Sequence, residues 1–586
     1  MSTSDITPNF DDRRLAGGPH VANRSTDDCR DARTRGVHTR HKAAHGEQEN
    51  GGVTPESSYT GMTEAFGVTP ESGDGRAQNA LGVAAQQDGV TAAGADVIAH
   101  GVTAHGATVH DATAHLSDDT QVLQRRLTHR QISMIGLSGA LGTGLFLGSG
   151  SVIALAGPAT IISYVIAGSF ALAVVWALAE MVSTHPVAGG HGTVAAAYLG
   201  QRGGYVARWN FAVQSLVAVG AEVTATATYL QFWFPSLPLW VGTLCCAGVI
   251  VAFNVFSVHL YGTSEYWFSM IKVVAAVAFI ALGLALVFGA VPGVPALGWG
   301  NLAPADGGFF PMGITGVLAA ACMAVFSFGG IENVSSTAAE SENPQRDIPQ
   351  AAAAMIWRIV IFYLAAIAVV LALQPWQATA ATGGTIEQSP FVRALALSGV
   401  DMAAHVMNAV LIVAALSAAN GCLYAATRMI HALAVDGQAP RVAARVAANG
   451  APRGAVGIAL IGVGAAALLS TVAPGGAFMF LLGATTVAIL ITWCIIMATH
   501  LAFRKARRAA GLPIAKRRLW GAPAVNWLVI AACVAIFVAL YWLMPLAWYA
   551  GVPYIAVLFS SFELLRRMRS LAPPRNLLAE ELAERE

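Results

Sequence analysis

Charge is the first thing this sequence lacks. Only 11% of its 586 residues are charged, against 55% that are hydrophobic, and the mean hydropathy is +0.58. Soluble proteins carry about a quarter charged residues, so this chain cannot cover a water-facing surface of the usual kind. The formal net charge of +1 gives no reason to expect a nucleic-acid partner. The composition excludes an ordinary soluble enzyme.

Paired cysteines and common catalytic motifs are also missing. The seven cysteines are scattered, mostly inside apolar runs, and none forms a Cys-x-x-Cys pair. We interpret them as small buried residues rather than as disulfide partners or metal ligands. The sequence contains no Gly-x-Ser-x-Gly, His-Glu-x-x-His or Walker motif, which are signatures of hydrolases, zinc proteases and nucleotide binders. We therefore expect no enzyme activity, no metal and no cofactor.

The first 120 residues contain no tryptophan and no apolar run, so they have neither a core nor a secretory signal. The phrase Gly-Val-Thr-Pro-Glu-Ser occurs at 52–57 and again at 67–72. Histidines recur every five residues from His100 to His115, but a helix would spread that period around its circumference, which leaves no preformed metal site. Low-complexity sequence of this kind predicts a disordered cytoplasmic tail over 1–120.

Long apolar runs begin at about residue 131. Each has about 20 residues, the length that spans a bilayer as a helix, and the predicted fold class is all-α and polytopic. We place twelve spans at about 131–154, 159–183, 206–232, 239–258, 266–290, 312–336, 355–374, 400–426, 455–473, 477–501, 522–544 and 547–565.

Arginine and lysine alternate between the loops. The loop after the tenth span carries seven of them between residues 504 and 518, whereas the loops on the opposite side carry only Arg393. The positive-inside rule then places both termini in the cytoplasm and requires an even number of spans. We interpret the basic runs as topology signals and not as nucleic-acid sites. The transmembrane domain is predicted over 121–570, and 571–586 is a short cytoplasmic tail.

Two spans are interrupted by glycine. Six glycines lie between Gly136 and Gly150, and the sixth span contains Phe326-Ser-Phe-Gly-Gly-Ile-Glu332 with a carboxylate at mid-helix depth. Small residues also permit close helix packing, which would explain one such helix. Breaks at corresponding positions of two halves are typical of inverted-repeat transporters. Here they predict repeats over about 131–290 and 312–501, with two extra helices over 522–565.

An unwound helix exposes backbone N–H groups at one half-helix end and carbonyl groups at the other. The N–H groups suit a carboxylate and the carbonyls suit an ammonium. A pair of such breaks can therefore hold both ends of a zwitterionic amino acid without a charged side chain.

Several segments carry a family resemblance. Ser138-Gly-Ala-Leu-Gly-Thr-Gly-Leu-Phe-Leu-Gly-Ser-Gly150, Phe328-Gly-Gly-Ile-Glu332 and Ser417-Ala-Ala-Asn-Gly-Cys-Leu-Tyr424 resemble signatures of proton-coupled amino acid transporters in the amino acid/polyamine/organocation superfamily. The resemblance is colinear over about 123–570. It implies the leucine-transporter-like 5+5 fold with discontinuous helices 1 and 6. It also implies a permease of the cell inner membrane that imports an amino acid by proton symport with alternating access.

The resemblance also implies which residues bind the substrate. We expect the two breaks to supply Ser138, Gly139, Ala140, Gly142, Thr143, Gly144, Phe328, Gly329, Gly330 and Glu332. The chain departs from the family pattern at Ser138, His191 and Thr263, where the family usually has Gly, an aromatic residue and Glu. These departures bear on substrate specificity.

Ionisable residues inside a membrane are costly and are usually functional or paired. Glu222, in the third span, is either a proton carrier or a partner in a hydrogen bond between helices. Lys272, in the fifth, either extends to the cytoplasmic surface or, as the resemblance implies, replaces the cation of sodium-coupled relatives by cycling a proton. Glu332 either contacts the substrate ammonium or stabilises the break.

Other polar and aromatic residues have two readings as well. Glu180 and His185 are interpreted as the wetted end of the second helix. Ser417 and Asn420 either line the path or hydrogen-bond a neighbour. Phe326 and Phe328 lie beside the break, where an aromatic ring could close over a ligand.

Two functions remain open at this point. The first is proton-driven import of an amino acid, and the alternative is exchange of one amino acid or amine for another on the same fold. The expected partners are an amino acid, protons and the lipid bilayer, and the expected state is a monomer or weak oligomer.

Overall fold

The computed structural model describes residues 142–586, apart from 257, 306, 381–388, 398, 400, 448–449, 516, 570, 572 and 586. The predicted tail over 1–120 and the beginning of the first predicted span lie outside the described residues. So do three of the expected site residues, Ser138, Gly139 and Ala140.

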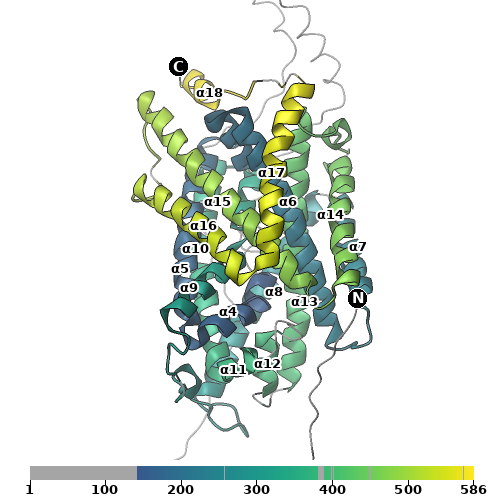
Figure 1. The fold of residues 1–586 in the computed structure, drawn as a ribbon, viewed down its shortest axis with the longest axis vertical. Helices are drawn as coiled ribbons and strands as arrows, with labels where there is room; N and C mark the ends of the chain where they lie inside the picture. Colours follow the sequence, from purple (N-terminus) through teal and green to yellow (C-terminus); the bar gives the residue numbers. More distant parts are fainter. Residues whose placement is uncertain are drawn as a thin grey trace, which may run out of the picture. The chain divides into compact units, whose positions relative to one another are not determined.

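The described residues are helical and contain no β-strand. Most of the long helices run along one common direction (Figure 1). The α-helices are α3 (Thr143–Phe146), α4 (Ser149–Ala156), α5 (Thr160–Thr184), α6 (Gly190–Gln231), α7 (Leu239–Phe256), α8 (Val258–Val287), α9 (Gly313–Ala324), α10 (Pro344–Leu373), α11 (Trp376–Ala380), α12 (Pro390–Leu397), α13 (Asp401–Val435), α14 (Arg453–Val472), α15 (Ala477–Ala509), α16 (Ala524–Leu543), α17 (Pro545–Met568) and α18 (Leu577–Ala583). Short 3₁₀ helices are η1 (Gly157–Ala159), η2 (Gly300–Leu302), η3 (Val325–Phe328), η4 (Ile331–Glu340) and η5 (Arg441–Ala444).

Within the described part of the chain, nine helical stretches are long and apolar enough to cross a membrane, and two shorter apolar helices lie at Leu239–Val255 and Ile361–Leu373. One of the nine stretches, Thr143–Thr184, contains parts of two predicted spans. Where they are described, the predicted runs lie mainly on helices, with an interruption at 329–330 in the sixth. A chain with this many apolar helices is a polytopic membrane protein.

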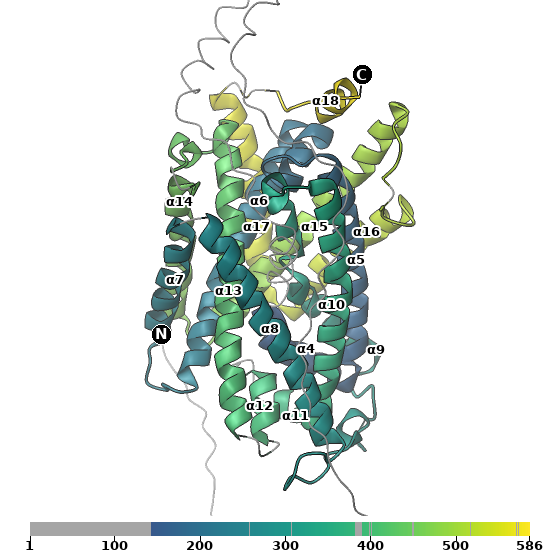
Figure 2. The ribbon, with the colours of Figure 1, turned by 180° about the vertical axis from the view of Figure 1, so that it is seen from behind.

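Helix α6 lies at the centre of the bundle and packs against α13 and α15, while α5 packs against α10. Figure 2 shows α8 crossing α13 and α10 obliquely on the other side. Small residues allow the close approaches, as in Gly220 against Ala466 and Gly483 against Ala547. The described cysteines form no disulfide, and Cys246, Cys422 and Cys533 are buried as expected. The exposed Cys245 corrects our interpretation for that residue.

The C-terminal segment forms a helix that contacts the rest of the described chain. Asn576 caps α18 by accepting a hydrogen bond from the Ala579 N–H at 3.2 Å. Leu577 is buried, and Glu581 pairs with Arg507 at the end of α15. The helix α18 therefore packs against the end of the bundle at which α15 and α17 finish (Figure 1).

Candidate functional site

Helical geometry is interrupted in the sixth predicted span. After η3, Gly329 is extended (φ −61°, ψ 145°) and Gly330 is left-handed (φ 94°), before η4 begins at Ile331. A positive φ is strained for residues other than glycine, so Gly330 permits the chain to change direction here. In the first predicted span, Gly142 is extended (φ −116°, ψ −161°) and α3 begins at Thr143.

Glu222 of α6 lies directly against the start of α3. Both of its carboxylate oxygens accept a hydrogen bond from the Thr143 backbone N–H at 3.2 Å. A methyl group on Gly142 would lie 2.5 Å from Glu222 Oε1, which is closer than van der Waals contact allows. Glycine at position 142 therefore lets this carboxylate reach the backbone.

Ser327 joins the two glycine-containing segments. Its hydroxyl donates to the Gly144 carbonyl at 2.7 Å and lies 3.1 Å from the Tyr164 hydroxyl. Its own carbonyl accepts a hydrogen bond from Tyr363. A methyl group on Gly144 would lie 2.7 Å from the Ser327 Cα, so the two backbones are in contact. The start of α3 and the break after η3 form one structural unit.

A cavity of about 30 Å³ lies between these segments. Gly142 and Gly144 line it on one side and Ser327, Gly329 and Gly330 on the other. The remaining polar lining residues are Gln214, Ser215, Glu222, Asn333 and Thr485. The cavity therefore brings the backbone of both glycine-containing segments together with side chains of α6.

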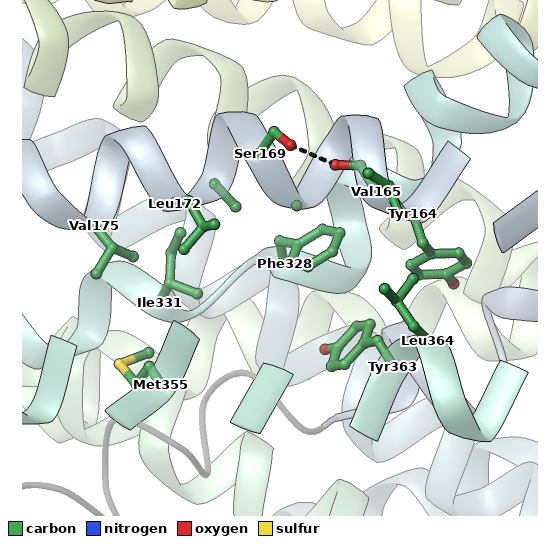
Figure 3. A pocket seen from close by; sticks show the side chains of 12 residues that line it. Tyr164, Val165, Ser169, Leu172, Val175, Phe328, Ile331, Met355, Tyr363 and Leu364 are labelled. Carbon is green, nitrogen blue, oxygen red and sulfur yellow. Dashed lines mark hydrogen bonds between the residues drawn. The ribbon is translucent and has the colours of Figure 1, made fainter. Parts of the chain in front are cut away.

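Phe328 points away from that cavity. Its ring stacks on Tyr363 at 5.1 Å and lines a second, mainly apolar pocket of about 100 Å³ between α5, α10 and the break (Figure 3). Gly168 of α5 makes room for the ring, because a methyl group there would lie 3.2 Å from Phe328 Cζ. Phe326 lines the polar cavity instead. Of the two phenylalanines, the structure thus brings Phe326 to the cavity.

Glu332 is fully buried in the first turn of η4 and accepts a hydrogen bond from the Gln214 amide of α6. This hydrogen bond therefore joins the third predicted span to the residues that follow the break. Gln214 precedes Glu222 by eight residues, and Ala218 lies midway between them. A spacing of four keeps residues on one helix face, and all three line the cavity.

Lys272 of α8 is fully buried and does not reach the surface, which corrects the reading in which it extends to the cytoplasm. The acidic groups whose charges act on it are Glu265 and Glu222. Glu265 is also buried, and it accepts hydrogen bonds from Ser417 and from Asn420, the latter at 3.1 Å. Ser417 and Asn420 thus hydrogen-bond a neighbour, as one of the two readings expected.

Glu265 is not among the site residues that the sequence predicts. The signal was present, because Glu265 and Lys272 are seven residues apart on one helix and so share a face. Asn333 and Thr485 were also missed. Asn333 directly follows Glu332 and Thr485 precedes Thr486, and no helical spacing relates either of them to the lining residues of α6.

The interpretation of Glu180 and His185 as a wetted helix end is wrong. Glu180 is 2% exposed and binds Arg504 through two hydrogen bonds of 2.9 and 2.7 Å, with His500 at 3.1 Å. His185, just beyond α5, is also buried, and its Nε2 lies 2.8 Å from the Tyr198 hydroxyl. Burial lowers the pKa of His185 to about 4, so it is neutral at physiological pH. His500 and Arg504 of α15 and Tyr198 of α6 cover this end of α5, which is why it is buried.

The two described departures from the family pattern lie in different surroundings. His191 is buried, with Nδ1 2.7 Å from the Ser335 hydroxyl and its ring edge-on to Phe211 at 4.8 Å. Thr263 is exposed. His191 therefore contacts η4, the helix that follows the break, whereas Thr263 lies on the protein surface.

Comparison with known proteins identifies the family. Residues 131–570 match the amino acid permease family. The aromatic amino acid transport protein AroP of Escherichia coli (strain K12) is 39% identical over 416 residues, covering 71% of this chain and 89% of that protein. The gamma-aminobutyric acid permease of Bacillus subtilis (strain 168) is 35% identical over 418 residues, covering 71% and 88%. A polytopic chain with this extent of similarity to transport proteins belongs to the amino acid permease family of the amino acid/polyamine/organocation superfamily.

Proposed function

We propose that this protein imports an amino acid across the cell inner membrane by proton symport with alternating access. The fold we propose has twelve transmembrane helices in a 5+5 inverted repeat, with helices 1 and 6 discontinuous. The observation that carries the proposal is the cavity between two glycine-containing segments, lined by exposed backbone and by the Glu222 carboxylate. Membership of the amino acid permease family supports the substrate class.

The substrate carboxylate would bind the backbone around Ser138–Gly144, and its ammonium would bind the carbonyls at Gly329 and Gly330 together with Glu332. Backbone groups at helix breaks recognise features common to all amino acids. Side-chain preference must then come from the other lining residues. Relatives named for aromatic amino acids and for gamma-aminobutyric acid lead us to propose those two classes as the first substrates to test.

Glu222 is the proposed site of proton coupling. Its carboxylate accepts the Thr143 N–H, which is a donor that a substrate carboxylate would also need. Two carboxylates at one donor repel each other, so a proton on Glu222 would favour substrate binding. Release of that proton after the substrate has left would restore the hydrogen bond to Thr143.

Lys272 is the second proposed coupling residue. It lies in the bilayer-spanning part of α8 and interacts electrostatically with both Glu222 and Glu265. A buried lysine that gains and loses a proton would change the charge balance of this group during transport. This proposal takes the position of Lys272 on the fifth helix as the counterpart of the cation site of sodium-coupled relatives.

The two glycine-containing segments support alternating access, because they line one cavity from two different predicted spans and such paired breaks are typical of transporters that rock around a central site. We further propose that both termini are cytoplasmic, on the basis of the basic loops, and that the protein works as a monomer or weak oligomer.

The test is uptake into proteoliposomes containing the purified protein. Radiolabelled phenylalanine and 4-aminobutyrate are offered with and without an imposed proton gradient, and the twenty amino acids are added as competitors. Symport predicts accumulation above the external concentration only with the gradient. Uptake that needs an internal amino acid and ignores the gradient would instead establish exchange, and no saturable uptake of any amino acid would overturn the proposal.

A further inference from the structure

A chain of buried side chains links Glu332 to α15 and α17. The Tyr554 hydroxyl of α17 donates to Asn210 Oδ1 at 2.9 Å, and Asn210 Nδ2 donates to Thr492 Oγ1 of α15 at 2.9 Å. Thr492 donates to Gln214 Oε1 at 2.5 Å, and the Gln214 amide donates to Glu332. Asn210, Gln214, Thr492 and Glu332 are all buried.

The direction of this chain follows from one backbone carbonyl. Asn210 Nδ2 also lies 2.9 Å from the Ala488 carbonyl, which can only accept, so the amide of Asn210 must present its NH₂ there. The same NH₂ then donates to Thr492, whose single hydroxyl proton is left for Gln214. Gln214 must accept that proton through Oε1, and its NH₂ therefore faces Glu332.

The hydroxyl of Thr492 has a different hydrogen-bond acceptor from the hydroxyls of the other threonines of α15. Thr485, Thr486 and Thr499 each donate to the carbonyl four residues earlier, at 2.7 to 2.8 Å, which is the common bond for threonine in a helix. At Thr492 that carbonyl belongs to Ala488, and Asn210 binds it instead. The hydroxyl of Thr492 is thereby released to bind Gln214.

We propose that Thr492 and Asn210 are positioning residues for transport, because together they fix the Gln214 amide with its N–H groups toward Glu332. A hydrogen bond to the charged form stabilises a carboxylate, so Glu332 is held ready to accept the substrate ammonium. This inference rests on the proposed function, in which Glu332 contacts that ammonium. It assigns to the tenth predicted span a role in substrate affinity through two residues that do not line the cavity.

Thr492→Val tests the inference, because it keeps the shape of the side chain and removes the donor. Without that donor the Gln214 amide can turn over and present its oxygen to Glu332. We expect the KM for uptake of radiolabelled phenylalanine, or of 4-aminobutyrate if phenylalanine is not accumulated, to rise about tenfold, as for the loss of one hydrogen bond to a charged group. The maximal rate should stay within about twofold, because a change in ground-state affinity leaves the transport step intact.

Three further variants distinguish a positioning role of the Thr492 hydroxyl from a role in packing alone. Thr492→Ser retains the hydroxyl and should restore the wild-type KM, and Thr486→Val removes a buried hydroxyl that bonds only its own helix and should leave KM unchanged. Asn210→Asp replaces the NH₂ by an oxygen, so it should raise KM like Thr492→Val, and it supplies the test if Thr492→Val does not fold. An unchanged KM in folded Thr492→Val, or an equal rise in Thr492→Ser or Thr486→Val, would overturn the inference. Absence of uptake by the wild-type protein would count against the proposed function itself.

Discussion

At the scale of single residues, the site depends on glycines, which have no side chain beyond Cα. Gly142 has no Cβ, and this alone allows Glu222 to approach the Thr143 N–H. Two other glycines also depend on having no side chain. Gly144 lets its backbone contact the backbone of Ser327, and Gly330 adopts a positive φ. The buried Glu222 carboxylate then lies next to backbone rather than next to a bulky side chain.

The substitution Gly142→Ala should reduce uptake at least tenfold. Its methyl group would meet Glu222 Oε1 at 2.5 Å, and the carboxylate would have to leave the Thr143 N–H. Initial uptake rates in proteoliposomes provide the measurement, normalised to the amount of protein inserted. Gly457→Ala is the matched control, because a methyl group there meets no atom within 4 Å. Wild-type rates in Gly142→Ala would show that this approach is only packing.

The substitution Lys272→Gln should abolish accumulation driven by a proton gradient while exchange of labelled for unlabelled substrate continues. Glutamine fills similar space but carries no proton that can be gained and lost at this site. The two activities are measured in the same vesicles with and without internal amino acid. Lys505→Gln, on the exposed face of α15, is the control. Accumulation against a gradient by Lys272→Gln would remove the coupling role of this lysine.

At the scale of helices, polar side chains hold the bundle together where small residues leave few apolar contacts. Glu180 connects α5 to α15 through Arg504 and His500, and also accepts the Leu519 N–H at 3.0 Å. Arg208 of α6 forms an ion pair with Asp436 and donates a hydrogen bond to Gln438, and both partners directly follow α13. These links join helices far apart in the sequence at the same end of the bundle.

The substitution Glu180→Gln should lower the free energy of unfolding by about 3 kcal/mol, because removal of one partner leaves Arg504 and its charge buried without compensation. A fall of several degrees in the melting temperature of the purified protein in detergent would report this loss. Glu580→Gln, which breaks an exposed ion pair with Arg575, should cause little change. Equal melting temperatures for Glu180→Gln and the wild type would contradict the prediction.

At the scale of the whole molecule, the permease similarity covers residues 131–570, and residues 1–120 have a different composition. Their low-complexity sequence contains no long apolar run that could pack against the bundle. We therefore expect the transport unit to be independent of this segment.

Deletion of residues 2–120 should leave membrane insertion and the KM for uptake unchanged. The comparison is made between the full chain and the deletion variant, expressed and reconstituted in the same way. Fluorescence-detected size exclusion reports folding, and radiolabelled uptake reports function. A deletion variant that inserts normally but no longer accumulates substrate would assign a role to this segment.

The sequence by itself determined the helical membrane class, the approximate positions of the apolar helices and the glycine-containing break after η3. Each of these depends on local properties: the length of an apolar run, the spacing of glycines, and the cost of charge in a bilayer. Glu222, Lys272 and Glu332 could be singled out for the same reason, since an ionisable residue in an apolar run is conspicuous in the sequence alone.

Only the tertiary structure decided what those residues contact. Phe326 and Phe328 are two positions apart in a short 3₁₀ helix, yet one lines the polar cavity and the other an apolar pocket. Glu180 looked like a wetted helix end because its partners, His500 and Arg504, lie more than 300 residues away. Hydrogen-bond direction at Gln214 depends on a carbonyl of α15, and no local pattern carries that information, because the partners meet only when separate helices pack together.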